Sequence, residues 1–221
     1  MSGFGILWEY RQAFMLGLLV TAELVILSCT VGTVLGVALE WLAGRKALWL
    51  RAALDWITLS VTAVPALVLL FWLYYPAQTL LRVSLSPFST ALIALVLMNA
   101  AGVYRIVADA VKEFPRQYIA SGKVCGLSRG EIVRFIKFPL LMRSVLPRWV
   151  DQQVIILQTS VFASLISVTE VFRVAQRVNA TEYRPIASYT AMAILFGLLA
   201  GGGMVLAKRL RRSYEHDFSE H

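Results

Sequence analysis

Five long runs of apolar residues alternate with shorter polar stretches along the chain. Each run is close to or longer than the roughly 20 residues with which a helix crosses a bilayer. The sequence therefore predicts an all-α integral membrane protein that forms a single transmembrane domain over residues 1–221. The five predicted spans lie at about residues 13–43, 54–75, 90–108, 150–168 and 188–207.

The polar stretch between the third and fourth runs, residues 109–148, is basic and amphipathic and is predicted to hold two short helices. In its first part, Phe114 and Tyr118 are four residues apart, and the small pair Ser121 and Gly122 follows one turn later. This spacing predicts one face of a short helix with a shallow, backbone-accessible patch at its end. Gly126 is expected to end that helix, because a residue without a Cβ adopts the left-handed conformation readily.

A second short helix is predicted to begin at Ser128. Glu131 stands three residues later, which completes the spacing of a capping box. Pro139 is expected to stop this helix and Pro147 to start the next element. Two short helices hinged at Gly126 between membrane spans would suit docking onto another protein.

Composition and charge strengthen the membrane interpretation. The chain is 58% hydrophobic with a mean hydropathy of +0.69, and its formal net charge is +8. Most of the Lys and Arg residues fall in the loops after the first and third spans and in the C-terminal tail. By the positive-inside rule these parts are cytoplasmic and the N-terminus is outside, with membrane lipid as a partner. Basic residues placed between apolar runs argue against nucleic-acid binding.

The sequence contains no recognisable nucleotide-binding, metal-binding or catalytic motif. It lacks a G-x-x-x-x-G-K-[ST] phosphate loop, a His/Cys cluster with metal spacing and a plausible Ser/His/Asp set. Cys29 falls in a span and Cys125 in the basic loop, so a disulfide or a metal site is not expected. We therefore expect a protein that is not an enzyme and binds no cofactor.

Several residues inside the spans have two readings each. Pro65 could mark an interrupted helix along a translocation path or a simple kink. Arg105 could face the path or extend to the cytosolic interface. Thr159 and Ser160 could line the path or bond back to their own helix.

The first span poses two further questions. Glu23 could lie on a path or pack against a polar partner inside the bundle, because a membrane carboxylate is otherwise costly. Gly32 and Gly36 could mark close helix packing or ordinary glycine content.

The basic loop resembles the cytoplasmic E-A-A loop of ABC-importer permeases, most of all in their polar amino-acid uptake branch. The E-A-A position reads Ala120, Ser121 and Gly122 here, so the leading Glu is missing. The residues that recur at the family's spacing are Pro115, Ser121, Gly126, Ile136, Pro139, Arg143 and Pro147.

Residues in the spans extend the resemblance, with departures. Thr62 stands where the family has Arg in R-G-T-P-L-L, and Arg105 stands where it has Glu. Thr159 and Ser160 match its K-D-T-S-L, and Glu170 begins a segment similar to its E-L-x-R-x-x-Q. The candidates for the substrate path are thus Thr62, Pro65, Arg105, Thr159, Ser160 and Glu170. The departures suit either the non-binding half of a heterodimer or a substrate of different charge, such as an acidic amino acid.

The resemblance implies a permease subunit in the bacterial inner membrane that translocates amino acids or related polar solutes by alternating access. The implied partners are a second permease, the same or a paralogue, an extracytoplasmic solute-binding protein and a dimer of cytosolic ATP-binding subunits that holds ATP and Mg. Two alternatives remain at this point. An ion-driven secondary transporter would need intramembrane carboxylates, and a non-transporting scaffold would use the basic loop only to recruit a cytosolic partner.

Overall fold

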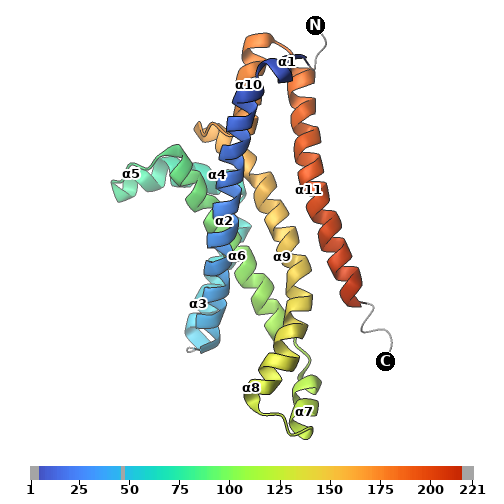
Figure 1. Cartoon of the computed structure of the whole chain (residues 1–221). Coiled ribbons are helices and arrows are strands. Elements are labelled where there is room, and N and C mark those ends of the chain that lie inside the picture. The colour runs from blue at the N-terminus through green and yellow to red at the C-terminus, as the bar shows by residue number, and fades with distance from the viewer. Residues whose placement is uncertain (1–4, 46–47, 216–221) are drawn as a thin grey trace.

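The computed structural model describes residues 5–45 and 48–215, and these contain helices and connecting turns but no strand. Figure 1 shows an elongated bundle with a small projection at one end. The helices in chain order are α1 Gly5–Glu9, α2 Arg11–Arg45, α3 Leu48–Ala63, α4 Ala66–Trp72, the π-helix η1 Leu73–Ala77, α5 Gln78–Leu81, α6 Pro87–Lys112, α7 Arg116–Val124, α8 Arg129–Glu131, the π-helix η2 Ile132–Lys137, α9 Phe138–Ser160, the 3₁₀-helix η3 Val161–Ile166, α10 Val171–Glu182 and α11 Pro185–Glu215.

Three of the described helices, α2, α6 and α11, are each long and apolar enough to cross a membrane. Two bent pairs, α3 with α4–α5 and α8–η3 with α10, raise the number of possible spans to five. The prediction of an all-α membrane protein with about five spans is confirmed.

Close packing of α2 against α6 forms the centre of the bundle. A Cβ on Gly32 would lie 2.6 Å from Asn99 Cβ, and one on Gly36 would lie 2.7 Å from the carbonyl oxygen of Ala100. Two helices approach this closely only where small residues line the contact. The structure therefore selects the helix-packing reading of the two glycines.

A buried polar network joins α2, α6 and α9 across this contact. Asn99, fully buried, donates from Nδ2 to the backbone oxygens of Ser28 and Cys29, both at 3.2 Å. Its side-chain amide also exchanges hydrogen bonds with that of Gln153, at 3.2 and 3.3 Å. Since an unsatisfied amide in an apolar interior is costly, these bonds fix the register of three helices at once.

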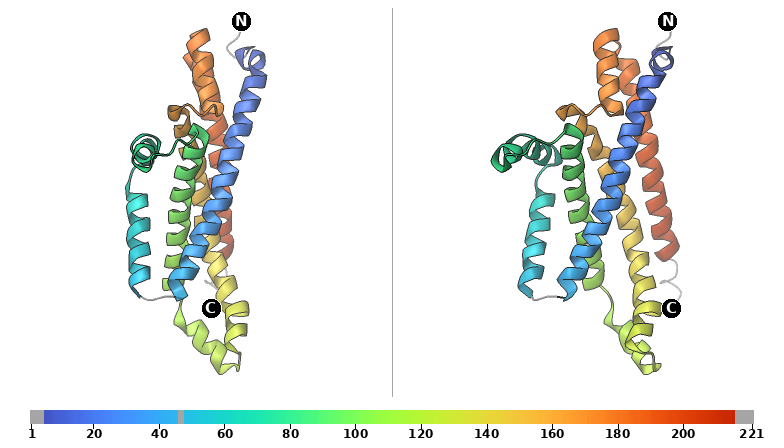
Figure 2. Two further views of the ribbon diagram at one scale, coloured as in Figure 1. Left: turned by 90° about the vertical axis from the view of Figure 1, so that its left-hand side faces the viewer. Right: turned by 60° about the vertical axis from the view of Figure 1, so that its left-hand side comes forward.

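The second predicted span, 54–75, is two helices rather than one. The helix is interrupted between Ala63 and Ala66, and the axis of α4–α5 is bent by 101° from that of α3. Figure 2 shows this arm turned sideways out of the bundle. Pro65 causes the break, since proline disfavours helical backbone in the preceding residue and donates no hydrogen bond. Helix resumes at Ala66 and runs on through the wide turn of η1, which accommodates Pro76.

Pro139 and Pro147 do not act as the sequence analysis expected. Helical backbone runs without interruption from Arg129 to Ser160, so Pro139 stops nothing and Pro147 lies inside α9. The wide turns of η2 come directly before Pro139 and relieve the clash that a proline ring makes with the preceding turn. Of the predicted loop 109–148, the residues up to Lys112 therefore belong to α6 and those from Phe138 onward belong to α9.

The length of α2 explains the position of Glu23. A helix of 35 residues is about 52 Å long, whereas the bilayer core is about 30 Å thick. If the membrane begins near Arg45, its other boundary lies about 20 residues back, close to Glu23. Glu23 is exposed, so the expectation that it packs against a partner inside the bundle is wrong.

Candidate functional site

The two-helix projection, which we define as residues 116–137, extends beyond the ends of α2, α3 and α11 (Figures 1 and 2). Its first helix, α7, ends at Gly126 with a φ of +76°. There the Leu127 N–H donates to the Gly122 oxygen and the Gly126 N–H to the Lys123 oxygen, both at 3.0 Å. This pattern is a Schellman motif, which reverses the chain directly after the helix. The predicted hinge at Gly126 is confirmed.

The predicted capping box that starts the second helix is also confirmed. The Glu131 N–H donates to Ser128 Oγ at 3.3 Å, and the Ser128 N–H donates to Glu131 Oε2 at 2.8 Å. Hydrogen bonds from Ser128 hold the pKa of the Glu131 carboxyl below its usual range. The carboxylate therefore remains ionised, and the cap formed, at neutral pH.

Gly122 is a packing contact between the two helices of the projection. It is buried, and a Cβ there would lie 2.9 Å from Ile136 Cδ1 and 3.1 Å from Ile132 Cγ1. The expected accessible patch at Ser121–Gly122 is therefore reduced to Ser121, which is exposed together with Ala120. Pro115 precedes α7 as its N-cap residue.

The outer surface of the projection is partly apolar. The side chains of Val124, Val133 and Phe135 are 87%, 53% and 63% exposed. Apolar side chains on a small helical surface mark contact sites when they lie together outside the lipid region.

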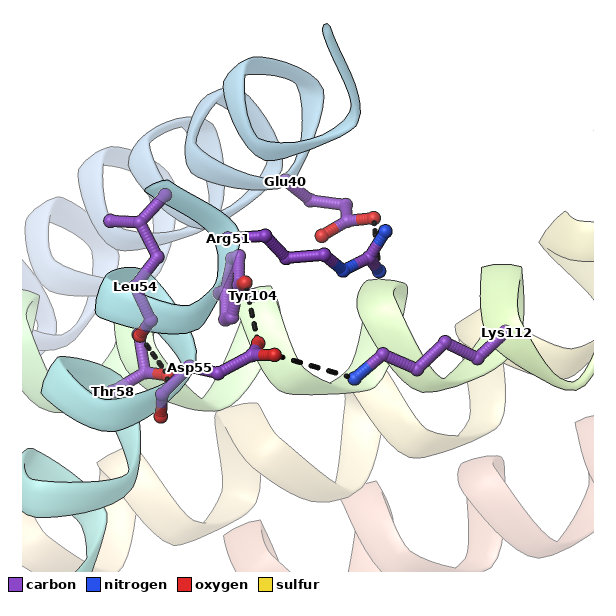
Figure 3. A network of polar contacts seen from close by, with 7 residues as sticks. All are labelled: Glu40, Arg51, Leu54, Asp55, Thr58, Tyr104 and Lys112. Carbon is purple, nitrogen blue, oxygen red and sulfur yellow. Dashed lines mark hydrogen bonds and ion pairs between the residues drawn. The ribbon is translucent and has the colours of Figure 1, made fainter. Parts of the chain in front are cut away.

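A polar network connects the base of the projection to α3. Lys112, the last residue of α6, lies 3.7 Å from Asp55 Oδ2, and Tyr104 Oη donates to Asp55 Oδ1 at 2.7 Å (Figure 3). In the same region Arg51 pairs with buried Glu40 at 3.4 Å, which ties α3 to α2. Lys112 lies four residues before α7, so this ion pair is close to the start of the projection.

Thr62 and Arg105, two path candidates, are in contact. Arg105 Nη1 on α6 donates to Thr62 Oγ1 on α3 at 3.0 Å, and both residues are exposed. Thr62 lies two turns beyond Asp55 toward Pro65, so Arg105 extends toward the broken span rather than toward the Lys112 end of α6. This is also the direction in which a side chain on α6 leans, toward the N-terminus of its helix.

Thr159 and Ser160 bond to their own helix. Thr159 Oγ1 donates to the Ile155 oxygen and Ser160 Oγ to the Leu157 oxygen, both at 2.7 Å. Ser160 is fully buried. Of the two alternatives for these hydroxyls, lining the path or bonding to the preceding turn of their own helix, the structure shows the second. Pro65 is exposed at the break, one turn from Thr62.

Glu170 caps α10 and lies apart from the other candidates. It is fully buried and accepts the N–H groups of Phe172 and Arg173 at 2.8 and 2.7 Å. Thr21 on α2 donates to it at 3.4 Å. At the other end of α10, Tyr10 Oη donates to Glu182 at 2.8 Å, which raises the pKa of Tyr10. These carboxylates hold α10 against α2.

The sequence analysis missed both polar networks. Asp55 and Asn99 each interrupt an apolar run, and that is the signal that could have found them, because polar groups in membrane helices are retained where they have partners. Their partners, Lys112, Tyr104 and Gln153, lie on other helices at long sequence separation. One sequence gives no indication of that pairing.

The described residues combine helices that are long and apolar enough to cross a membrane, two of the possible spans being bent pairs, with a basic two-helix projection. Residues 32–216 match the protein family described as the inner membrane component of binding-protein-dependent transport systems. The chain belongs to this family.

Curated relatives and solved structures agree with this assignment. The chain is 26% identical over 198 residues to an octopine transport system permease protein of Rhizobium meliloti, covering 86% of this chain and 81% of that protein. It is 25% identical over 217 residues to the histidine/lysine/arginine/ornithine transport system permease protein of Escherichia coli K12, and the match covers 94% of this chain and 90% of that protein. A crystal structure of an amino acid ABC transporter with histidines superposes with a TM-score of 0.84 at 18% identity, covering 95% of this chain and 98% of that one.

Family membership decides between the functions that the sequence left open. The chain is a membrane-spanning permease subunit of an ABC importer, and ATP hydrolysis belongs to a separate subunit. The secondary transporter and the scaffold are thereby rejected.

Proposed function

We propose that this permease carries amino acids or related small polar solutes inward across the bacterial cytoplasmic membrane. The names of its relatives support this substrate class, since they are permease proteins of transport systems for octopine, for glutamine and for histidine, lysine, arginine and ornithine. The chain would work with a second permease, the same or a paralogue, and with an extracytoplasmic solute-binding protein. ATP and Mg would be held by a dimer of cytosolic ATP-binding subunits.

The observation that carries the proposal is the two-helix projection. It extends past the ends of its neighbouring helices, presents Ala120 and Ser121 on its surface and is surrounded by basic residues. We assign it to the cytosol, because most Lys and Arg residues lie at this end of the bundle. The ATP-binding subunit would dock there, and the N-terminus would lie outside.

Transport by alternating access requires that docking in two nucleotide states moves the spans. A movement of α7 would reach Lys112, then Asp55 on α3, and from α3 the Thr62–Arg105 contact beside the break at Pro65. The shift between inward and outward states can be no larger than the difference in docking free energy between the two nucleotide states. In this sequence of contacts, Gly122, Ile136 and Gly126 keep the projection rigid enough to transmit the motion.

Arg105 is the residue that we assign to recognition of the substrate carboxylate. It is an exposed guanidinium on a helix long and apolar enough to cross a membrane, and Thr62 fixes its direction. A hydrogen bond to a charged group contributes about 1.5–3 kcal/mol. A substrate carboxylate would replace the Thr62 hydroxyl as the acceptor. Thr159, Ser160 and Glu170 have structural hydrogen bonds and would shape the path without touching the substrate.

Arg105→Ala is expected to weaken binding of amino-acid substrates to the purified complex by roughly tenfold or more, which corresponds to the lost charged hydrogen bond. A ligand screen by calorimetry first identifies the substrate, and the affinity of each complex is then measured for this amino acid and for the amine that lacks its carboxylate. Arg105→Ala should weaken binding of the amino acid but not of the amine, and Thr62→Val should weaken binding of the amino acid less than Arg105→Ala does. Unchanged affinity of the Arg105→Ala complex would remove this residue from the site.

A further inference from the structure

A cavity of about 540 Å³ lies where four parts of the chain meet at the base of the projection. Its lining comes from the end of α6, from α7, from the first half of α9 and from the basic end of α11. The volume falls within the range of about 300–1,000 Å³ that is typical of small-molecule sites. The cavity is separate from the Thr62–Arg105 contact, which lies further into the bundle, and the proposed transport mechanism does not use it.

Three arginines line this cavity: Arg143 and Arg148 on α9 and Arg211 on α11. Arg148 pairs with Glu113 at 3.3 Å, and Arg211 pairs with Asp151 at 3.2 Å. Each of these two ion pairs uses one guanidinium nitrogen, whereas a guanidinium has five N–H donors in a planar fork. Both side chains remain about half exposed, so each can hold its carboxylate and a further anion together.

The rest of the cavity wall is largely apolar. The lining includes Phe114 and Tyr118, whose ring centroids are 6.3 Å apart, together with Leu140 and Pro147. On α11, Met204 is half exposed and lies two turns from Arg211 on the same face of the helix. A ligand with an anionic head and an apolar tail fits this combination of surfaces.

Exposed tryptophans at the basic end of the bundle indicate that the cavity is near the membrane boundary. Trp41 and Trp49 are exposed at the corresponding ends of α2 and α3, and Arg45 stacks over the Trp41 ring at 3.9 Å. Tryptophan and arginine in such positions are typical of the headgroup region. Basic pockets between membrane helices at this level are suited to anionic lipid headgroups.

We propose that this cavity binds the phosphate headgroup of one anionic glycerophospholipid, such as phosphatidylglycerol, from the adjacent leaflet. The arginines contact the phosphate, and the acyl chains continue over the exposed apolar surface of α11. Because Tyr118 belongs to α7, the lipid joins the projection to α9 and α11. The position of the projection against α9 and α11 therefore depends on the anionic lipid content of the membrane.

The test is native mass spectrometry of the purified transporter complex and of the permease alone, after exchange into defined phosphatidylglycerol and phosphatidylcholine mixtures. We expect one phosphatidylglycerol retained per chain and no comparable retention of phosphatidylcholine. The double variant Arg143→Gln/Arg211→Gln should lower retention about thirtyfold, consistent with roughly 1 kcal/mol for each basic residue. The matched control, Arg209→Gln/Arg212→Gln, removes the same charge from the same end of the bundle at residues that do not line the cavity, and should retain the lipid.

Three results would overturn the proposal. Equal retention of both lipids by the wild-type complex shows that the cavity does not select an anion, whatever the variants do. Competition by soluble glycerol phosphate as strong as that by the lipid assigns the cavity to a water-soluble anion. Lipid that is retained by the permease alone but is absent from the complex would mean that the ATP-binding subunit, and not a lipid, occupies the cavity in the transporter. Since neither ATP nor amino acid is present, the result is independent of the proposed substrate.

Discussion

Gly36→Val is expected to prevent α2 from packing on α6 and to leave little correctly folded permease. A Cβ at this position would lie 2.7 Å from the Ala100 oxygen and 3.0 Å from the Tyr104 nitrogen, which are backbone atoms of a helix and cannot move independently. Overpacking costs typically about 1–3 kcal/mol even where side chains can adjust, and the cost should lie at or above the top of that range here. Separating the helices would also break the contacts between Asn99 and α2.

Thermal unfolding in detergent, followed by size-exclusion chromatography with fluorescence detection, measures this effect. Gly44→Val is the matched control, because Gly44 belongs to the same helix and a Cβ there meets nothing within 4 Å. Both variants introduce the same β-branched residue into α2, so the difference between them isolates the contact with α6. Equal melting temperatures for the two variants would mean that α2 and α6 do not approach as the structure describes.

Gly126→Val is expected to abolish most transport while leaving the permease in the membrane and the ATP-binding subunits active. The φ of +76° at this position costs a residue with a Cβ roughly 1–2 kcal/mol, and more for a branched one. The chain can avoid the strain only by rotating the turn that sets α7 against η2. A rotated α7 would no longer convey the nucleotide cycle to Lys112, so we expect transport to fall by about tenfold or more.

Vesicles reconstituted with the complete transporter allow transport and ATP hydrolysis to be measured in one sample. Gly130→Val serves as the control, since Gly130 lies in the same projection, has open space around its Cα and does not have a positive φ. That variant should transport at close to the wild-type rate. Wild-type transport by Gly126→Val would show that the projection does not couple the two activities.

Local sequence features predicted the projection well. The capping box at Ser128 and Glu131 and the left-handed turn at Gly126 depend on residues within a few positions of each other, and both formed as expected. Pro139 was misjudged because the π-helical turn before it relieves the proline clash, and that turn packs against α7 and α9. Pro147 was misjudged as the start of an element, whereas it lies inside the continuous helix α9. An interrupted helix at Pro65 was one of two alternatives drawn from the sequence, and the angle of the break depends on contacts of α4 with α6 and η3.

The path candidates show a second limit of reasoning from sequence. Arg105 and Thr62 were singled out separately as departures from a family pattern, and only the fold shows that they touch. Glu170 was selected by the same pattern, yet its carboxylate is occupied by the N-terminus of α10 and by Thr21. Whether a polar residue serves a path or a helix end depends on neighbours that are distant in the sequence.

Labelling of Cys125 with a membrane-impermeant maleimide tests the docking role of the projection most directly. Cys125 is exposed beside Gly126, and Cys29→Ser removes the other cysteine, which lies half-buried in α2. We predict that Cys125 reacts in inside-out vesicles and not in right-side-out vesicles, and that bound ATP-binding subunit slows the reaction at least about tenfold. Reaction from the outer face, or an unchanged rate with the ATP-binding subunit bound, would contradict the account.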